Sequence, residues 1–413
     1  MVGKKWSIKG RWDKKAILLL IVVSLLICGC AKKENEVASE DKEREKLVLW
    51  SYYETEAQQK ALDTLMKDFN RSQNTYEASW KYVPMTEFTK NLSIGVTEKD
   101  LPDMVIIDNP DMKTYINLGM FADITPYIHE WNRTEDYYVE VLSSVKKEEA
   151  YYGLPICCNN LGLIYNQDML ELAGLQPPGN WEELLICAQK LSTEKTYGFA
   201  MSALEGEQCS FQAAPWILSA GKMESAFAEE ACLSAFTKMN TFLQNGYMDR
   251  NCVNWSQVDI ARKFVAGEAA MMENGPWVLS MLEEANMSFG IVPLPVGEEN
   301  RVLIGGENLG VIKGKNVDGA VTFLKYYNQD TVMQKFCKEA RVLPPKRSLA
   351  VQEGEDNPKL MVFVKQMDTA LSRSSFSKWS KISMGISDAS YQLFTGEKTP
   401  EEIAEQLNTQ WKE

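Results

Sequence analysis

Apolar and polar residues alternate with two different periods in the part of the chain that follows residue 45. "KLVLW" (residues 46–50) and "DMVIID" (103–108) are short continuous apolar runs, which are typical of strands buried on both faces. "YEASWKYV" (76–83) predicts a further strand between them. A helix is expected after the first run, because apolar residues recur there at helical spacing: Ala57, Ala61, Leu62, Leu65, Met66 and Phe69. The order strand, helix, strand, helix, strand predicts a parallel sheet with right-handed crossovers.

The second half of the chain shows the same kinds of signal. Asn180, followed three residues later by Glu183, resembles a capping box that opens an amphipathic helix. Residues 268–273 are predicted to form a strand, followed by a turn and a helix with Pro276 at its first position. A last helix is expected over residues 399–411, because its Thr, Pro and Glu open it in the same manner.

Polar and aromatic residues follow two of the predicted strands at their carboxyl ends. "WSYYE" (50–54) comes at the end of the first strand, and "DNPD" (108–111) at the end of the third. In open α/β sheets, ligands bind beyond the carboxyl ends of the strands. The pattern therefore predicts a ligand site at this edge of the sheet.

The amino-terminal segment has the features of an export signal. Its apolar run, residues 16–30, is too short to span a bilayer and ends in small and cysteine residues. The run is preceded by six basic residues: Lys4, Lys5, Lys9, Arg11, Lys14 and Lys15. "ICGC" resembles the lipobox of bacterial lipoproteins, and Cys30, which follows a glycine, fits the acylated position better than Cys28, which follows Ile27. We expect a signal peptide over 1–29 and a lipid on Cys30; an uncleaved signal anchor is the alternative.

Residues 31–46 are predicted to be a flexible tether. They contain no aromatic residue and are dominated by charged side chains, so they cannot bury enough apolar surface to order themselves. With Cys30, this segment would let the folded body hang from the outer face of the cell membrane.

The charge of the chain excludes several kinds of partner. The formal net charge is −13 for the whole sequence and −18 after removal of residues 1–29, which carry six basic residues and one Asp. So acidic a protein is a poor candidate for binding nucleic acid or anionic lipid, because phosphate contacts need Lys and Arg. A hydrophobic content of 45% in a chain of this length predicts a large core, divided between two domains.

The cysteines and the single histidine argue against a metal site or cofactor. Seven cysteines remain in addition to Cys28 and Cys30: Cys157, Cys158, Cys187, Cys209, Cys232, Cys252 and Cys337. This odd number argues against a full disulfide framework, and we expect buried free thiols. With no C-x-x-C pair and His129 as the only histidine, a zinc site is not expected.

Five motifs in order resemble one protein family. They are "LPDMVIIDNPDMKTYINLGMFADITPYI", "YYGLPICCNNLGLIYNQDML", "NWEELLICAQKLS", "FVAGEAAMMENGPW" and "FTGEKTPEEIAEQL". Together they resemble the extracellular solute-binding proteins of carbohydrate ABC transporters, the family that includes maltose-binding protein. The resemblance covers nearly all of residues 47–413.

The resemblance implies an α/β fold of the two-lobed periplasmic-binding-protein type II. Parallel or mixed sheets would be flanked by helices, and the lobes would be joined by crossing hinge strands. The implied N-terminal lobe comprises residues 47–157 and about 308–355, and the implied C-terminal lobe residues 159–305 and about 356–413. The implied function is capture of a sugar, with an oligosaccharide expected, and its delivery to the permease subunits of an ABC transporter by a monomeric, extracytoplasmic protein without enzymatic activity.

A sugar presents apolar faces and a ring of hydroxyls, so its site needs aromatic platforms and planar amide or carboxylate partners. By resemblance, Trp277 and Trp379 are stacking residues. The implied set is completed by two ligand loops, one crossing residue and the strand end before Trp277: Tyr52, Tyr53, Glu54, Asp108, Asn109, Asp111, Asn159, Glu273 and Asn274.

Four further candidates have an equally acceptable structural explanation. Trp216 in "PWILSAG" could line the cleft or pack in the core. Glu307 and Asn308 in "GGENLG" could contact ligand, or the glycines could simply let two backbones approach. Arg341 could bind a hydroxyl or a cleft carboxylate, or be a solvated surface residue.

Three other functions are weighed against sugar capture. A lipid-anchored glycoside hydrolase would also need paired carboxylates, but no barrel or sandwich pattern is evident. A polyamine or peptide ligand would also suit an acidic cleft with tryptophans. A Cys157–His129 nucleophile pair is disfavoured, because a lone histidine in "YIHEW" is more often a surface or structural residue.

Overall fold

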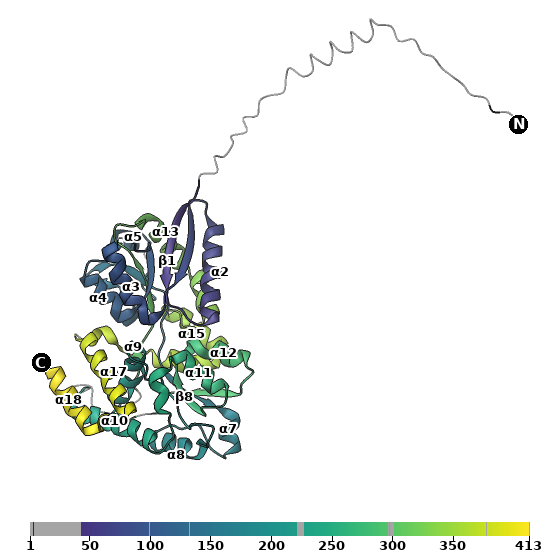
Figure 1. Cartoon of the computed structure of the whole chain (residues 1–413). Helices are drawn as coiled ribbons and strands as arrows, with labels where there is room; N and C mark the ends of the chain where they lie inside the picture. Colours follow the sequence, from purple (N-terminus) through teal and green to yellow (C-terminus); the bar gives the residue numbers. More distant parts are fainter. Residues whose placement is uncertain are drawn as a thin grey trace, which may run out of the picture. The chain divides into compact units, whose positions relative to one another are not determined.

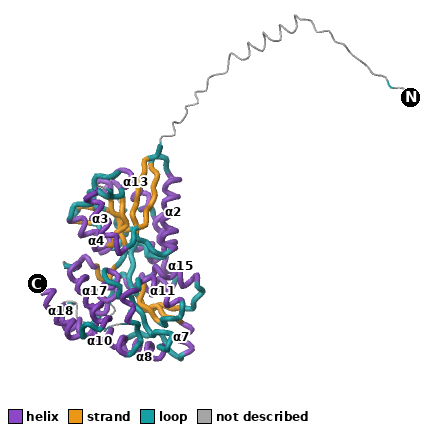
Figure 2. Tube along the Cα trace, viewed as in Figure 1, coloured by secondary structure: helices purple, strands orange, loops and turns teal. Residues whose placement is uncertain are grey.

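The computed structural model describes Gly3 and residues 43–412, apart from residues 99, 132, 221–226, 296, 298–300 and 377. Residues 44–413 form one compact unit, drawn as ribbon in Figure 1 and as a tube in Figure 2. The predicted signal peptide over 1–29, the lipid on Cys30 and most of the predicted tether lie outside the described residues. The last two tether residues are part of the first strand. Of the helices described, none is long and apolar enough to cross a membrane.

The first sheet contains the strands predicted from the start of the folded unit. Its order is β2-β1-β3-β11-β6, formed by β2 (Tyr76–Tyr82), β1 (Glu45–Ser51), β3 (Met104–Asp108), β11 (Glu307–Val311) and β6 (Gly153–Pro155). β1 is parallel to β2 and β3, which confirms the predicted parallel pairing of these strands, and β3 is buried along its whole length. β11 runs antiparallel between β3 and β6, so the sheet is mixed.

Helices cover this first sheet, as Figure 1 shows around β1. The second element, α2 (Glu56–Ser72), is the helix predicted from the spacing of Ala61, Leu65 and Phe69, which are all buried. A capping box formed by Thr55 and Gln58 fixes its start. The remaining elements of this region are α3 (Met85–Glu98), α4 (Asn109–Asn117), α5 (Thr125–Trp131), α6 (Val139–Ser143), the hairpin of β4 (Lys146–Lys147) and β5 (Ala150–Tyr151), α13 (Val317–Tyr327), α14 (Asp330–Ala340) and α15 (Arg347–Asp356).

A second sheet has the order β8-β7-β9 and is antiparallel throughout. It consists of β8 (Met271–Asn274), β7 (Gly162–Asn166) and β9 (Phe289–Val292). The strand expected over 268–273 is β8, which starts three residues later and ends one residue later than predicted. Pro276 opens a 3-10 turn, η3 (Pro276–Val278), that leads into α12 (Leu279–Glu284), so the predicted order of strand, turn and helix is confirmed.

Helices also surround the second sheet, as Figure 1 shows around β8. α8 (Trp181–Leu191) starts at Asn180, whose side chain accepts from the Glu183 amide, while the Glu183 carboxylate reaches the Gly179 amide. α18 (Pro400–Lys412) has the expected reciprocal bonds between Thr399 and Glu402. The other helices are α7 (Gln167–Leu172), α9 (Glu207–Leu218), α10 (Glu229–Gln244), η2 (Arg250–Asn254), α11 (Gln257–Val265), α16 (Pro358–Gln366), η4 (Arg373–Ser375) and α17 (Trp379–Thr395).

Extended segments connect the two sheets, and Figure 2 shows loop segments between the two groups of strands. Asn159 pairs with Gly305, and Cys158 pairs with Leu343, each in an antiparallel bridge. Gly306 has φ +116°, and a Cβ there would lie 2.5 Å from the carbonyl oxygen of Cys157. Only glycine allows this close approach of two crossing backbones. A short parallel pair, β10 (Leu303–Ile304) and β12 (Leu371–Ser372), lies next to the crossing.

The cysteines behave as expected from their number. All seven cysteines outside the signal region are buried and free. Burial raises the pKa of Cys157, Cys158 and Cys337, so these thiols stay protonated and act as small apolar residues.

Candidate functional site

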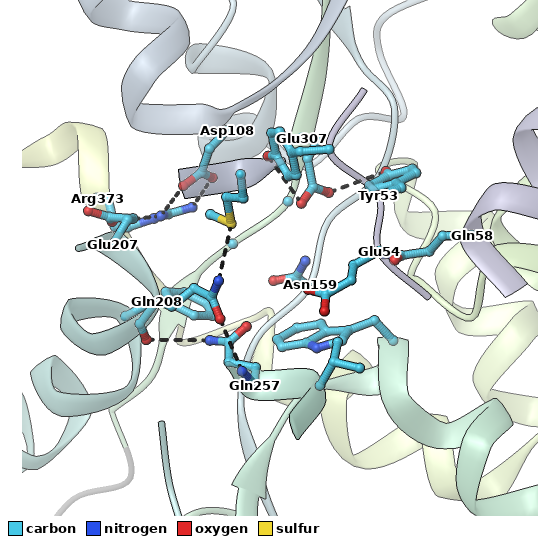
Figure 3. A pocket seen from close by; sticks show the side chains of 17 residues that line it. Tyr53, Glu54, Gln58, Asp108, Asn159, Glu207, Gln208, Gln257, Glu307 and Arg373 are labelled. Carbon is cyan, nitrogen blue, oxygen red and sulfur yellow. Dashed lines mark hydrogen bonds and ion pairs between the residues drawn. The ribbon is translucent and has the colours of Figure 1, made fainter. Parts of the chain in front are cut away.

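A cleft lies where the ends of the first-sheet strands approach the elements around the second sheet. It contains about 700 Å³ of empty space, including its opening to solvent. Its walls come from the loop after β1, the end of β3, the crossing segments, α9, α11 and η4. Figure 3 shows Tyr53, Glu54 and Gln58 on one side of the cavity and Arg373 with Glu207 on the other, with Asn159 between them.

Two tyrosines from the loop after β1 form one wall. Tyr52 packs edge-on against Phe88, with ring centroids 5.1 Å apart, and its hydroxyl lies 3.5 Å from Glu307 Oε1. The Tyr53 hydroxyl donates to Glu307 Oε2 at 3.4 Å. Burial raises the pKa of both tyrosines, and the Glu307 carboxyl and the Cys157 thiol add to the shift. Both hydroxyls are therefore neutral hydrogen-bonding groups at any physiological pH.

Glu307 reaches the cleft because β11 pairs directly with β3, which places Glu307 opposite Asp108 in the register. Cys157 Sγ donates to Glu307 Oε2 at 2.8 Å from beneath the carboxyl group. Burial, reinforced by Asp108, raises the pKa of Glu307 to about 7, although Cys157 and Arg373 oppose the shift. A carboxyl group with this pKa changes its charge near neutral pH.

The opposite wall is built on a buried guanidinium. Arg373 binds Asp108 in bidentate fashion at 2.5 and 2.6 Å and also donates to Glu207 Oε1 at 2.8 Å. Burial alone would lower the pKa of Arg373, but the two carboxylates hold it above the ordinary value. Glu207 also accepts from Trp379 Nε1 at 3.0 Å and from Ser383. These bonds fix both carboxylates, since a bidentate arginine pair is geometrically specific.

Trp277 provides an aromatic surface in the cleft. It lies in η3, directly after β8, and Asn274 Oδ1 accepts from the Gly275 amide at 3.0 Å at the start of this turn. The indole folds back over Gly275 so closely that a Cβ there would lie 1.9 Å from the ring. Gly275 therefore permits the position of the indole.

Asn159 contributes an acceptor without a protein partner. It is only 5% exposed, lines the cleft, and its Oδ1 has no hydrogen-bond partner among the described residues. A buried polar atom without a partner costs free energy, so Asn159 stays a predicted ligand residue of this cleft.

A second, larger pocket adjoins the first and shares Tyr52, Asp108 and Glu207 with it. It contains about 1550 Å³ of empty space and is lined by Asp111 and Trp379 among others. Gln208 Nε2 contacts Met85 Sδ at 3.6 Å, and both residues line both pockets. The space available is therefore elongated, with Trp277 in the first pocket and Trp379 in the second.

Comparison with known proteins places this arrangement in a family. The family described as bacterial extracellular solute-binding protein matches residues 64–362, which is more than half of the chain. The chain belongs to this family.

Relatives and solved structures agree with the assignment. A multiple sugar-binding protein of Streptococcus mutans is 24% identical over 79% of this chain and 81% of the relative. A maltodextrin-binding protein of Bacillus subtilis is 22% identical over 94% of each chain. The structure of maltose-bound MalE3 of T. maritima superposes with a TM-score of 0.80 at 19% identity, covering 89% of this chain and 99% of that one. The fold of this solute-binding protein is thus the expected two-lobed α/β type II fold.

The cleft of this solute-binding protein brings together seven of the predicted ligand residues. These are Tyr52, Tyr53, Glu54, Asp108, Asn159, Trp277 and Glu307, and the adjoining pocket adds Asp111 and Trp379. Their contact with a ligand remains a prediction.

Six predicted ligand residues do not line either pocket. Trp216 is fully buried and donates from Nε1 to Glu273 Oε2 at 2.9 Å, and burial raises the pKa of Glu273. Asn274 Nδ2 donates to the Gln257 carbonyl oxygen, which supports a cleft-lining residue. Asn109 is buried beside Asp108, and Asn308 forms a hydrogen bond with Ser144. Arg341 forms an ion pair with Glu283 at 2.7 Å. In this structure all six have structural partners or are buried in the fold.

Several cleft residues were not predicted from the sequence. Glu207 and Gln208 start α9 after Gly206, whose φ of +107° marks the turn, and that glycine was the available signal. Arg373 follows a two-residue strand that no periodicity reveals. The other unpredicted side chains that line the first pocket are those of Gln58, Met85, Phe211, Gln257 and Val258. They lie on helices, and the local sequence of a helix does not predict which other part of the chain it will face across the cleft.

Among the described residues, no three His, Cys, Asp or Glu side chains converge on a position that could hold a metal ion. Cys157 lies buried beneath Glu307, whereas His129 is exposed on α5. The family and the relatives are solute-binding proteins and not enzymes.

Proposed function

We propose that this protein captures an oligosaccharide in the cleft and delivers it to the permease of an ABC transporter. The observation that carries the proposal is the pairing of aromatic faces with planar polar groups in an elongated cleft. Trp277 and Tyr52 offer rings for the apolar faces of a sugar, and Asn159, Glu54 and Glu307 offer acceptors for its hydroxyls. The sugar-binding names of two relatives support the same ligand class.

Capture would proceed by hinge closure. The lobe boundaries are expected near residues 157–159, 305–308 and 355. The antiparallel bridge between Asn159 and Gly305 joins the first two of these regions, and the bridge of Cys158 starts in the first. A ligand that contacts residues of both lobes binds the closed form more tightly and shifts the population towards it. The closed, loaded protein, acting as a monomer, would then dock on the permease.

A thermal-shift screen tests the ligand class. The full chain, purified in a detergent without a sugar head group, is mixed with mono- and oligosaccharides, polyamines and short peptides. A ligand at one hundred times its dissociation constant stabilises the native state by about 2.7 kcal/mol, so a sugar that binds raises the melting temperature visibly. Stabilisation by polyamines or peptides alone would overturn the carbohydrate assignment.

We also propose that the protein is held at the outer face of the cell membrane by a lipid on Cys30. The chain offers a matched pair of cysteines for the test, because Cys28 lies two residues away in the same motif. Cys30→Ser should release the protein from the membrane fraction, whereas Cys28→Ser should leave it anchored. Retention of the Cys30→Ser variant would contradict the lipobox assignment.

A further inference from the structure

The charges around the cleft are strongly unequal. Glu54, Asp108, Glu207 and Glu307 line the first pocket, and Asp111, Glu205 and Asp388 line the adjoining one. Arg373 is the single basic residue among the described residues that line either pocket. Seven carboxyl groups therefore surround this space with one guanidinium.

The guanidinium of Arg373 already forms hydrogen bonds within the protein. Arg373 uses both terminal nitrogens on Asp108 and one of them also on Glu207, and its Nε donates to the Ile304 carbonyl oxygen. Its position over the Phe211 ring, 4.9 Å from the centroid, fixes it further. Its hydrogen bonds are thus made to Asp108, Glu207 and backbone, and none is made to Glu54, Glu307 or Asp111.

The excess negative charge is unfavourable for the buried carboxyl groups that carry it. Burial, reinforced by Asp108 and Glu207, raises the pKa of Asp111 to about 7, and burial and Asp108 do the same for Glu307. The groups facing Glu307 are Tyr52 and Tyr53 from the loop after β1, Cys157 from a crossing segment, Asp108 from β3 and Arg373 from η4. None of these is a positive charge free to compensate it.

The chemistry of the lining distinguishes between ligand classes. Anionic solutes are repelled by it, and the carboxyl groups are too dispersed to chelate a metal ion, as no three converge among the described residues. The amide side chains of Gln58, Gln208 and Gln257 line the same cleft and can bind neutral hydroxyls, whereas the charge of the unpaired carboxyl groups is not balanced by a neutral hydroxyl. An ammonium group supplies both charge and three N–H donors. Asn159, whose buried Oδ1 has no partner among the described residues, lines the same cleft and adds an uncharged amide to it.

We propose that the carbohydrate bound in this cleft carries protonated amino groups, as amino sugars and their short oligomers do. This inference rests on the proposed sugar-binding function. The rings of Trp277 and Trp379 serve the apolar faces of the sugar, and the face of an aromatic ring also attracts an ammonium group.

Isothermal titration of the full chain with matched sugars tests the proposal. Glucosamine, galactosamine and their di- to tetrasaccharides are each compared with the hydroxyl and N-acetyl counterparts of the same linkage. Because hydrogen bonds to charged groups contribute more than those between neutral groups, we expect the amine to bind at least about tenfold more tightly than either counterpart. Its affinity should also fall with added salt.

The outcomes separate this inference from the function on which it rests. Equal or tighter binding of the neutral counterparts would overturn the amino-sugar inference and leave sugar capture intact. Binding of spermidine with no binding of any sugar would overturn both, as would binding of neither class to the folded chain.

Two variants locate the amine. Glu54→Gln and Glu307→Gln each remove one charge from the cleft while keeping the shape of the side chain, and Glu54 lies at an exposed position where the fold is little affected. At least one of them should reduce amino-sugar affinity about tenfold. Glu194→Gln, at an exposed position outside both pockets, is the matched control and should bind like the parent. Unchanged affinity in both cleft variants would contradict the proposal.

Discussion

At the scale of single residues, Trp277 shows how the cleft depends on a neighbouring backbone atom. Its ring lies directly over Gly275, where a Cβ would be 1.9 Å from the indole. Gly275 has φ −109°, a value that alanine adopts without strain. A methyl group at this position would therefore move the ring without requiring a different backbone.

Gly275→Ala should weaken ligand binding, and Trp277→Ala should weaken it by roughly 1–3 kcal/mol through lost stacking and buried area. Titration with the sugar identified by the screen measures both effects. Gly179→Ala is the control, because its Cβ would meet only Glu183 Oε2 at 3.6 Å. If Trp277→Ala bound as tightly as the parent protein, Trp277 would not belong to the ligand site.

Glu307 predicts how the stability of the empty protein depends on pH. Its pKa is raised from 4.5 to about 7 in the folded state. Between these values the folded protein holds a proton that the unfolded chain has lost, so the free energy of unfolding falls as the pH rises from about 5 to 8. The shift corresponds to a loss on the order of 3 kcal/mol, and Asp111 contributes in the same direction.

Urea denaturation at pH 5, 6, 7 and 8 tests this prediction. Glu307→Gln cannot ionise and should lose stability less steeply over this range than the parent protein. Glu194→Gln, at an exposed position, should keep the parent's pH dependence. Parallel curves for the parent and Glu307→Gln would show that Glu307 does not titrate near neutral pH.

At the scale of elements, local signals allowed much of the fold to be predicted. β1, α2, β3 and α18 follow from apolar spacing and capping residues that lie within the element itself. The antiparallel insertion of β11 between β3 and β6 was not predicted, because it pairs residues that are far apart in sequence. The same reason explains the site. Tyr52 follows β1 and Asp108 ends β3, two strands that the sequence reveals, whereas Arg373 reaches Asp108 only through the tertiary fold.

The capping box of α2 links helix stability to the cleft. Thr55 Oγ1 accepts from the Gln58 amide at 3.2 Å, and the Gln58 side chain accepts from the Thr55 amide and hydroxyl. Gln58 itself lines the cleft. Thr55→Ala should lower the free energy of unfolding by about 0.5–2 kcal/mol.

Chemical denaturation compares Thr55→Ala with Thr237→Ala. Thr237 is exposed in the interior of α10, where alanine is the better helix former, so this control should be neutral or slightly stabilising. An equal loss in both variants would mean that the cap contributes nothing specific.

At the scale of the whole folded unit, Arg373 connects the two sheets. Asp108 ends β3 of the first sheet, whereas Arg373 follows α16, which packs on β9 of the second, and Glu207 starts α9. The guanidinium is 3% exposed and stands between two carboxylates that would otherwise repel each other. The group therefore favours approach of the two expected lobes even without a ligand.

Arg373→Met leaves Asp108 and Glu207 facing one another without a counter-ion. Removing one partner of a buried ion pair costs about 3–5 kcal/mol of stability. The two carboxylates, which bind the same guanidinium in the parent protein, would then repel each other and oppose closure. We therefore expect Arg373→Met to have a lower free energy of unfolding than the parent protein. We also expect it to have a larger radius of gyration, measured by small-angle X-ray scattering. Arg347→Met, which removes the exposed pair with Asp368 and the contact with the Tyr138 ring, should change neither by much. Neutralising the partners in Arg373→Met/Asp108→Asn/Glu207→Gln should restore most of the compactness, because the repulsion is removed with the charges. If the triple variant were as expanded as Arg373→Met, repulsion between these carboxylates would not be what opens the cleft.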